Sequence, residues 1–377
     1  MTQLIYLDNS ATTKIDPLVL EAMLPYLQEE YGNPSSKYYL LAENAKKAVS
    51  VAREQVAALI GCHPDEIIFT SGATESNNFI IKGIIDHYSS SSNLIITTKV
   101  EHPSVLETCN YLQTKEVKVN YLDVDNYGRI NADQLHSLIK INKPVLVSAI
   151  WGNNEIGSLN PIKELATVCK QAGVFFHSDA TQVIGKLPVN MTDIPGLCFL
   201  SLSAHKLCGP KGIGAAIIRK QSDEIYTKIT PLLHGGGQEN NYRSGTLAVH
   251  NIVGFGKAAE IAMKQLTDNQ RKLLDLESYL SDILSSTLGD KVYFNHDNSD
   301  KIPGILSVQF KGVNNELLLK KLSPYAALSS GSACSSSKPS HVLSAIGMTS
   351  EEIRQTIRFS LSPHTLPSDL DFFKSLR

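Results

Sequence analysis

Between residues 67 and 177 the chain alternates short apolar runs with longer helical patterns, and this alternation constrains the fold more than any other feature. The apolar runs cover 67–69, 94–97, 117–122, 145–150 and 174–177. Strands that are joined through helices need crossover connections, which favour parallel pairing with helices on both faces of the sheet. The pattern therefore predicts an α/β fold with a mostly parallel sheet sandwiched by helices.

Two helices are predicted before the first of these strands. Asp16 and Pro17 have the residue types of a helix cap and a first helical residue. A second helical pattern runs from about 36 to 60 and ends at Gly61, a residue that commonly terminates helices. These helices are expected to join the layers that cover the sheet.

The pattern of predicted helices and strands changes beyond about residue 260. A long helical pattern is followed by short strands near 293, 306–310 and 326–328, which is typical of a smaller α+β domain. A chain of 377 residues also exceeds the size that one core usually supports. We expect a large domain over 16–261 and a small domain formed by 1–15 and 262–377.

Charge and cysteine usage exclude several classes of function. The formal net charge of −2 gives no reason to expect nucleic-acid or membrane binding, and the N-terminal residues lack the pattern of a secretory signal. The chain has six cysteines and no CxxC pair, which predicts free thiols in a reducing compartment. We expect a cytoplasmic protein. The cysteines are Cys62, Cys109, Cys169, Cys198, Cys208 and Cys334.

Four polar clusters follow predicted strands of the sheet. SGATESNN begins at residue 71, EH at 101, WGNNEIG at 151 and SDATQ at 178. Ligands of open α/β sheets bind at the carboxyl ends of the strands, and parallel strands bring these ends to one edge. The sequence therefore predicts a ligand site at this edge of the sheet.

The SGATES segment lies where a strand turns into a helix, with small residues that permit close approach of a ligand to the backbone. Backbone N–H groups at a helix N-terminus, together with the Thr74 hydroxyl, can hold a phosphate. The alternative is an ordinary helix cap formed by Ser71 or Thr74. No GK[ST] sequence follows, so a nucleoside triphosphate is not expected.

Asp179 and its neighbours suggest the rest of a cofactor site. A carboxylate that follows a buried strand needs a cationic partner, and a protonated heterocyclic nitrogen would supply one. The alternative is a structural ion pair or a helix cap. The amides of Gln182 and Asn154 can donate to a phenolate-type oxygen. His102 is either a structural histidine or a ring that stacks on a flat cofactor and moves protons.

The stretch SLSAHKLCGPKG, at 201–212, places Lys206 next to a turn built from glycine and proline. A partly desolvated lysine amine loses its proton and attacks carbonyls, whereas the alternative is a solvated lysine in a turn. A phosphate cup, an anion for a ring nitrogen, an amide for a ring oxygen and a nucleophilic lysine together indicate pyridoxal 5′-phosphate.

Motifs along nearly the whole chain resemble the cysteine desulfurases of the NifS/IscS group, in the class V aminotransferase branch of the fold type I proteins that depend on pyridoxal phosphate. The matching stretches are YLDNSATT at 6, GNPSS at 32, FTSGATESNN at 69, EH at 101, NNEIG at 153, DATQ at 179, SAHKLCGPKGIGA at 203, HGGGQE at 234, RSGT at 243, SSGSACSS at 329 and IRFSL at 357. One departure is the pair Asn240 and Asn241, which stands where relatives often have Arg-Gly.

The resemblance implies a role for each matching residue. Lys206 matches the lysine that binds the cofactor covalently, and His102 matches the stacking histidine that handles protons. Thr246 matches a threonine that reaches the phosphate from the other subunit, which implies a homodimer. Asn33 and Arg358 match the residues that bind the substrate carboxylate. The remaining cofactor positions are Ala73, Thr74, Asn154, Asp179, Gln182, Ser203 and His205, and no metal is implied.

Cys334 completes the mechanism that the resemblance implies. Its thiolate takes the sulfur of L-cysteine as a persulfide, leaves L-alanine, and passes the sulfur to an acceptor protein such as an iron–sulfur scaffold or a tRNA-thiolating enzyme. From the residues alone, a serine-rich linker with an incidental cysteine is the alternative. Cys208 is a rival nucleophile, but it lies in a fixed turn. Selenocysteine lyase, a related β-lyase and a non-catalytic sulfur-trafficking partner remain alternative functions.

Overall fold

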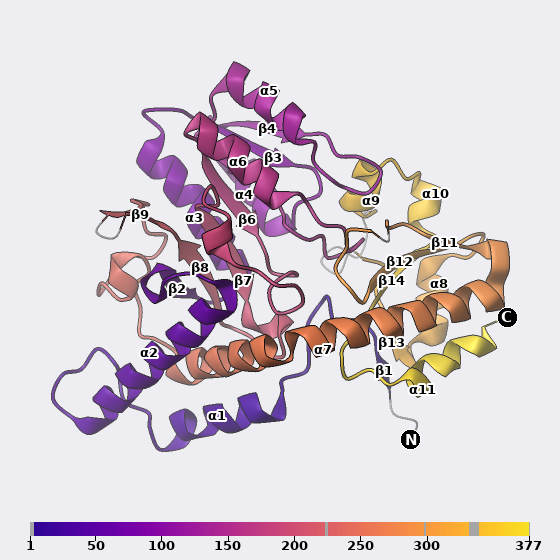
Figure 1. Cartoon of the computed structure of the whole chain (residues 1–377), viewed down its shortest axis with the longest axis horizontal. Coiled ribbons are helices and arrows are strands. Elements are labelled where there is room, and N and C mark those ends of the chain that lie inside the picture. The colour runs from indigo at the N-terminus through magenta and orange to yellow at the C-terminus, as the bar shows by residue number, and fades with distance from the viewer. Residues whose placement is uncertain (1–3, 223–224, 298, 332–338, 377) are drawn as a thin grey trace.

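The computed structural model describes residues 4–222, 225–297, 299–331 and 339–376. A sheet of seven strands forms its centre (Figure 1), in the order β2-β8-β7-β6-β5-β3-β4. All neighbouring pairs are parallel except the two that involve β8, so β8 alone runs against the others. The strands are β2 (Ile67–Thr70), β3 (Leu94–Thr98), β4 (Lys118–Leu122), β5 (Leu146–Ser148), β6 (Phe175–Asp179), β7 (Phe199–Ser203) and β8 (Gly214–Ile218).

The predicted α/β architecture is confirmed, and β7 and β8 are the two strands of the central sheet that lie beyond the alternation of 67–177. The connection from β7 to β8 covers only residues 204–213 and contains no α-helix. Such a short connection returns the chain antiparallel, whereas a parallel neighbour needs a longer crossover. This connection carries Lys206, and the two adjacent strands fix both ends of the connection.

Side chains of the central strands alternate between two apolar cores, as the pleat of a sheet requires. Ile67 and Phe69 contribute to one core, while Ile68 between them contributes to the other. The first core includes residues of α1, α2, α5, α6 and α7, and the second includes residues of α3 and α4. These helices are α1 (Pro17–Gln28), α2 (Leu40–Ile60), α3 (Ala73–Tyr88), α4 (Pro103–Gln113), α5 (Ala132–Asn142), α6 (Ile162–Ala172) and α7 (Val249–Leu288).

The first helix begins where the sequence predicts, and the second begins later. The Asp16 side chain accepts a hydrogen bond from the Leu18 N–H at 2.8 Å, with Pro17 as the first helical residue. Helix α2 begins at Leu40 instead of about residue 36. The reason is an Asx-type turn, in which Asn33 Oδ1 accepts from the Ser35 N–H at 3.0 Å and diverts the chain.

Helix α7 links the two parts of the molecule along the lower side of the view in Figure 1. Its 40 residues run through the predicted domain boundary at 261/262. Its first half packs closely on α2, and a Cβ on Gly256 would lie only 2.6 Å from the Ala52 Cα. Its second half contributes Leu273, Leu276 and Leu280 to a separate core.

This separate core lies under a small antiparallel sheet of β11 (Val292–Phe294), β12 (Ile305–Phe310) and β14 (Thr356–Ser360). The N-terminal strand β1 (Ile5–Tyr6) pairs with β13 (Ala326–Ala327), so the first residues lie with the C-terminal part of the chain. The division into domains over 16–261 and over 1–15 with 262–377 stays a prediction. The remaining elements are β9 (Lys220–Ser222), β10 (Ile225–Tyr226), α8 (Asn315–Leu322), α9 (His341–Ala345), α10 (Ser350–Ile353) and α11 (Pro367–Leu370).

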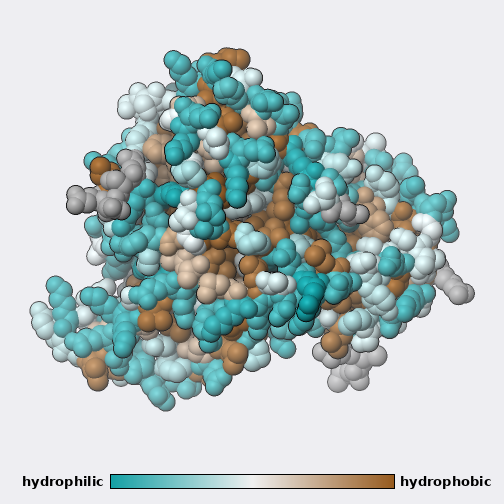
Figure 2. Space-filling model, in the orientation of Figure 1, coloured by the Kyte–Doolittle hydropathy of each residue, from teal (hydrophilic) through white to brown (hydrophobic). Residues whose placement is uncertain are grey.

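The face of the molecule in Figure 2 is largely hydrophilic at its margins, with apolar residues gathered in the hollow near its centre. Of the helices that the structure describes, none combines the length and the apolar character that crossing a bilayer would require. Within the same residues, no group of three or more His, Cys, Asp or Glu side chains is arranged to hold a metal ion.

Candidate active site

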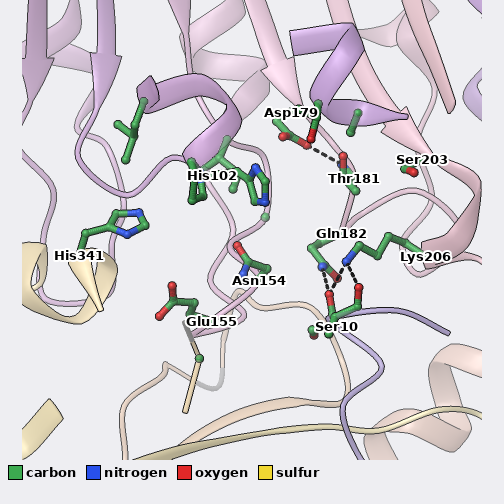
Figure 3. A pocket seen from close by; sticks show the side chains of 18 of the residues that line it. Ser10, His102, Asn154, Glu155, Asp179, Thr181, Gln182, Ser203, Lys206 and His341 are labelled. Carbon is green, nitrogen blue, oxygen red and sulfur yellow. Dashed lines mark hydrogen bonds between the residues drawn. The ribbon is translucent and has the colours of Figure 1, made fainter. Parts of the chain in front are cut away.

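A cavity of about 1680 Å³ opens between the carboxyl edge of the central sheet, the N-terminal segment and the C-terminal part of the chain. Figure 3 shows the side chains that point into it. Ten of the residues predicted from the sequence line this one cavity, although up to 285 positions separate them along the chain, from 73 to 358. They are Ala73, Thr74, His102, Asn154, Asp179, Gln182, Ser203, His205, Lys206 and Arg358.

The N-terminus of α3 lies at one wall of the cavity, and no N-cap side chain accepts a hydrogen bond from its first N–H groups. The N-cap is Gly72, without a side-chain hydrogen bond, so the predicted alternative of a cap by Ser71 or Thr74 is wrong. Strand β8 approaches this loop so closely that a Cβ on Gly214 would lie 2.6 Å from the Gly72 Cα. The backbone N–H groups of the first helical turn are thus available to an anion.

Ser203 and His205 extend the wall from the end of β7. The His205 Nδ1 lies 3.1 Å from the Thr12 hydroxyl oxygen. Burial, reinforced by the charges of Lys206 and Lys211, lowers the pKa of His205 to about 4. The imidazole is therefore neutral at pH 7, and it can offer a hydrogen bond to a phosphate without adding a charge.

Asp179 is the last residue of β6 and is only 4% exposed. Its Oδ2 accepts from Asn77 Nδ2 at 2.8 Å, and its Oδ1 accepts from the Thr181 N–H at 3.0 Å. Among the described residues it forms no ion pair with a lysine, arginine or histidine. A buried carboxylate held by neutral donors at a cavity wall is suited to a cation that binds in the cavity.

A buried hydrogen-bond network connects Asp179 to His102. The second N–H of the Asn77 amide donates to the Ser104 Oγ at 2.8 Å, and the Ser104 Oγ lies 2.8 Å from the His102 Nδ1. The Ser104 backbone N–H also donates to this Nδ1 at 3.1 Å, which makes His102 the N-cap of α4. Because Nδ1 accepts hydrogen bonds, the proton of the neutral ring belongs on Nε2.

His102 is held neutral as well as oriented. Burial lowers its pKa, and the charges of Lys206 and His341 lower it further, while Asp179 acts in the opposite direction. The structural role of His102 is confirmed, since it caps α4. Its ring also faces the cavity (Figure 3), and stacking on a cofactor stays a prediction.

Lys206 lies across the cavity from His102, in the short helical turn of 204–206 after β7. Its amino group donates to the Ser10 carbonyl at 2.5 Å and to the Ala11 carbonyl at 2.6 Å. The Gln182 amide donates to the same Ser10 carbonyl at 2.9 Å. Residues 10 and 11 thus hold the Lys206 amino group close to the Gln182 amide, which the sequence predicts to bind the ring oxygen of the cofactor.

Cys208 follows this turn and is a weak nucleophile. Its backbone has a φ of 58°, and its N–H donates to the Thr13 Oγ1 at 2.8 Å. Burial raises the pKa of the Cys208 thiol above its ordinary value. The five cysteines that the structure describes are all free thiols.

Arg358, at the far wall, is 2% exposed and already engaged by the protein. Its Nη2 pairs with the Asp8 Oδ1 at 2.7 Å, and its Nη1 donates to the Asn154 carbonyl at 2.9 Å. A substrate carboxylate would have to share this guanidinium with Asp8. The sequence did not reveal Asp8, although it lies within the YLDNSATT motif.

The opposite end of the cavity from Lys206 carries Glu155 and His341 (Figure 3). Glu155 Oε2 accepts from the Ser340 hydroxyl at 2.5 Å, and His341 Nε2 lies 2.8 Å from the Glu101 carbonyl. Burial raises the pKa of Glu155, against the opposing effects of Ser340, His341 and Arg358. Neither residue was singled out from the sequence, since a lone carboxylate or histidine carries no signal of its surroundings.

Three buried polar atoms test whether this cavity fits a polar ring with a phosphate. Ser10 Oγ, Thr181 Oγ1 and Arg358 Nε have no hydrogen-bond partner among the described residues, and all three residues line the cavity. Buried polar atoms are rarely left without partners unless a ligand or water supplies them. They indicate a cavity whose polar groups await a ligand, and the bare helix N-terminus and Asp179 suit the phosphate and the ring nitrogen of pyridoxal phosphate.

Three predicted site residues are not brought to this cavity. Asn33 is exposed in the turn before α2, and Thr246 is exposed in the loop before α7. Cys334 lies outside the residues that the structure describes.

The departure at Asn240 and Asn241 has a physical explanation. Both residues have left-handed backbone conformations, with φ of 54° and 67°. Asparagine tolerates this region better than other residues with a side chain, so it can replace the glycine of relatives. The preceding Glu239, also left-handed at φ 50°, is held by a partly buried ion pair with Arg53 at 2.5 Å.

Comparisons with known proteins agree with the family resemblance of the sequence motifs. The family model for aminotransferase class-V matches residues 5–373. A curated relative from Dictyoglomus turgidum, cysteine desulfurase IscS, is 43% identical over 99% of this chain and 93% of its own length. A solved NifS-like protein is 36% identical with a TM-score of 0.91, covering 99% of this chain and 97% of its own. A structure of SspA in complex with cysteine is 34% identical with a TM-score of 0.84, covering 96% of this chain and 100% of its own.

Proposed function

The chain belongs to the aminotransferase class-V family and is a cysteine desulfurase, and we propose that its reaction takes place in the cavity lined by Lys206 and Arg358. Like its family, it depends on pyridoxal 5′-phosphate. The observation that carries the assignment of the site is Asp179, a buried carboxylate with no cationic partner among the described residues, at the wall of the cavity that also holds Lys206.

The residues of the cavity would hold the cofactor at three places. The N-terminal turn of α3, with Ala73 and Thr74, would bind the phosphate together with Ser203 and His205. Asp179 would pair with the ring nitrogen, and the Gln182 and Asn154 amides would approach the ring oxygen. His102 would lie against the ring. When bound, the cofactor withdraws electrons from the substrate carbon and thereby weakens the carbon–sulfur bond.

The protein groups around that position move protons and orient the substrate. Lys206 would give up its hydrogen bonds to the Ser10 and Ala11 carbonyls when its nitrogen acts as the nucleophile, and its amino group would carry protons to and from the substrate carbon. Neutral His102 offers its Nε2 proton from the other side of the cavity. Arg358 binds the substrate carboxylate in a charge-assisted contact. Asn33, which does not line the cavity, stays a prediction as a second ligand.

We propose that Cys334 receives the sulfur. Its thiolate attacks the sulfur of L-cysteine, a sulfur–sulfur bond forms, and the carbon–sulfur bond breaks. The electron pair of the broken bond stays with the substrate carbon, which takes up a proton and leaves as L-alanine. The persulfide is then passed to an acceptor protein, either an iron–sulfur scaffold or a tRNA-thiolating enzyme. The raised pKa of the Cys208 thiol and its fixed turn support Cys334 over Cys208.

The site is completed in a homodimer, in which Thr246 of the partner subunit reaches the phosphate. Two observations support this proposal. Thr246 is exposed and lies away from the cavity lining of its own chain. Helix α1 also exposes four leucines, each between 43% and 53% accessible, which is an unusual apolar surface for an isolated chain. They are Leu18, Leu20, Leu24 and Leu27.

The test is a comparison of two cysteine variants and one lysine variant. Cys334→Ser is expected to keep the yellow cofactor and to lose turnover of L-cysteine, whereas Cys208→Ser, as the matched control, keeps both. Lys206→Ala is expected to lose covalent attachment of the cofactor. Full turnover by Cys334→Ser would refute the persulfide assignment, and turnover of selenocysteine without cysteine would favour a selenocysteine lyase.

A further inference from the structure

Lys186 lies behind the cofactor site and belongs to none of the groups described so far. It sits on the turn that follows β6, where the Leu187 N–H donates to the Val183 carbonyl at 3.0 Å. Gly185 makes this turn possible, with a φ of +79°, and a Cβ there would lie 3.2 Å from the Leu207 side chain. The backbone is therefore held tightly, and it brings the Lys186 side chain back onto Gln182, four residues earlier.

The Lys186 amino group fixes the orientation of the Gln182 amide. Lys186 Nζ donates to the Gln182 Oε1 at 2.8 Å. In its charged form the Lys186 amino group has only donors, so the amide turns its oxygen toward Lys186 and its nitrogen the other way. The Gln182 Nε2 donates to the Ser10 carbonyl at 2.9 Å, which agrees with this orientation from the opposite end.

Gln182 and Lys206 converge on the same acceptor. The Ser10 carbonyl accepts from Lys206 Nζ as well as from Gln182 Nε2, as the dashed lines in Figure 3 mark. Gln182 is 4% exposed, so a reversed amide would leave a buried nitrogen facing the Lys186 ammonium. Lys186 thus controls which atom of Gln182 is presented beside the reactive lysine.

We propose that Lys186 is a positioning residue, which holds the Gln182 amide with its N–H toward the ring oxygen of the cofactor and places a positive charge behind Lys206. This inference rests on the proposed function, because it assumes that pyridoxal phosphate occupies the cavity. An anionic ring oxygen would find one N–H donor on Gln182 and, behind it, the charge of Lys186.

The electrostatic surroundings of Lys186 make its charge responsive to the ligand. Burial, reinforced by the charges of Lys206 and Arg358 and opposed by Cys208, lowers the pKa of Lys186 to about 7. Within the part of the chain that the structure describes, these three groups, from the turn after β7 and from β14, are the charged and titratable neighbours that act on it. An anion bound near Gln182 favours the charged form of Lys186.

The test uses cofactor binding and its absorbance, so it does not depend on turnover. Lys186→Met keeps the aliphatic stem, Lys186→Arg restores the donor and charge, and Lys163→Met, an exposed lysine on α6, is the matched control. Lys186→Met is expected to weaken pyridoxal phosphate binding roughly ten-fold, the effect of one hydrogen bond to a charged group. It should also move the pH midpoint of the visible absorbance upward, since one nearby positive charge is lost. Lys186→Arg should restore both.

A double-mutant cycle separates positioning from a general structural effect. In a Gln182→Leu background, Lys186→Met is expected to cause little further loss of affinity, because its target is gone. Unchanged affinity and midpoint in Lys186→Met, or an equal loss with and without Gln182, would overturn the inference. Failure of the wild-type protein to bind pyridoxal phosphate would instead overturn the proposed function itself. Thermal denaturation of the cofactor-free variants identifies any that are misfolded. If Lys186→Met is misfolded while Lys186→Arg is normal, Lys186 has a structural role only, and the inference is overturned.

Discussion

Replacing Asp179 by asparagine separates the role of its charge from the role of its shape. In the cofactor-free protein the carboxylate has two neutral donors, the Asn77 amide at 2.8 Å and the Thr181 N–H at 3.0 Å. An asparagine retains the oxygen that faces Thr181, and Asn77 has an Oδ1 without a partner among the described residues that can turn toward the new amide. The substitution therefore costs the cofactor-free protein no more than about 1.5 kcal/mol, one net hydrogen bond.

The cost is larger once the cofactor is bound. The variant then leaves a buried cation without its carboxylate partner, and breaking a buried pair costs on the order of 3 kcal/mol or more. At about 1.4 kcal/mol for each factor of ten, binding of pyridoxal phosphate should weaken by roughly 100-fold or more. The contrast between a small change in folding and a large change in binding is specific to a carboxylate that awaits a ligand cation.

Two measurements on the cofactor-depleted protein check this prediction. Absorbance titration with pyridoxal phosphate gives the dissociation constant, and urea unfolding gives the free energy of unfolding. Asp193→Asn, at an exposed aspartate of the same segment, is the matched control and should change neither. A variant at Asp179 that binds the cofactor within about three-fold of wild type, or that loses several kcal/mol of stability without cofactor, would refute the reasoning.

Three further predictions concern stability and the shape of the site. Burial lowers the pKa of His177 to about 4, so its neutral form stabilises the fold above the unfolded pKa of about 6.5. As the pH falls from 6.5 toward 4, on the order of 3 kcal/mol of the free energy of unfolding should be lost. The variant His177→Gln should show a smaller loss in urea unfolding over the same pH range. Asn241→Ala should destabilise the protein by about 1 kcal/mol, while Asn241→Gly is near neutral, because φ is 67°. Gly214→Ala places a Cβ 2.4 Å from the Leu202 carbonyl and 2.6 Å from the Gly72 Cα, so cofactor affinity should fall at least about ten-fold.

The layered fold was predictable because apolar runs and helical periods repeat along the chain. The burial of both faces of a strand such as β2 follows from its run of consecutive apolar residues between turns. The direction of β8 was not predictable, since a run of small and apolar residues does not indicate which strand it pairs with or in which direction. Strand β14 escaped detection because it contains Arg358, a charge that is buried only through contacts with residues far away in sequence.

The cofactor wall of the site was predictable because its residues follow strands, and strand ends of a parallel sheet meet at one edge. Lys206 and Asp179 illustrate this, although 27 positions separate them in the chain. Contacts from the N-terminal segment were not predictable in the same way. Ser10 and Asp8 reach the cavity through backbone and side-chain contacts that no local pattern encodes. The hydrogen bond from Lys186 to Gln182 likewise depends on a turn, and not on periodicity.

The central claim is that this protein removes sulfur from L-cysteine and leaves L-alanine. Its most direct test is the product balance of the purified protein, loaded with pyridoxal phosphate and supplied with L-cysteine and a thiol reductant. We predict that L-alanine and sulfide appear in equal amounts over many turnovers. Release of pyruvate and ammonia in place of alanine would indicate a β-lyase, and either that result or the absence of turnover would contradict the claim.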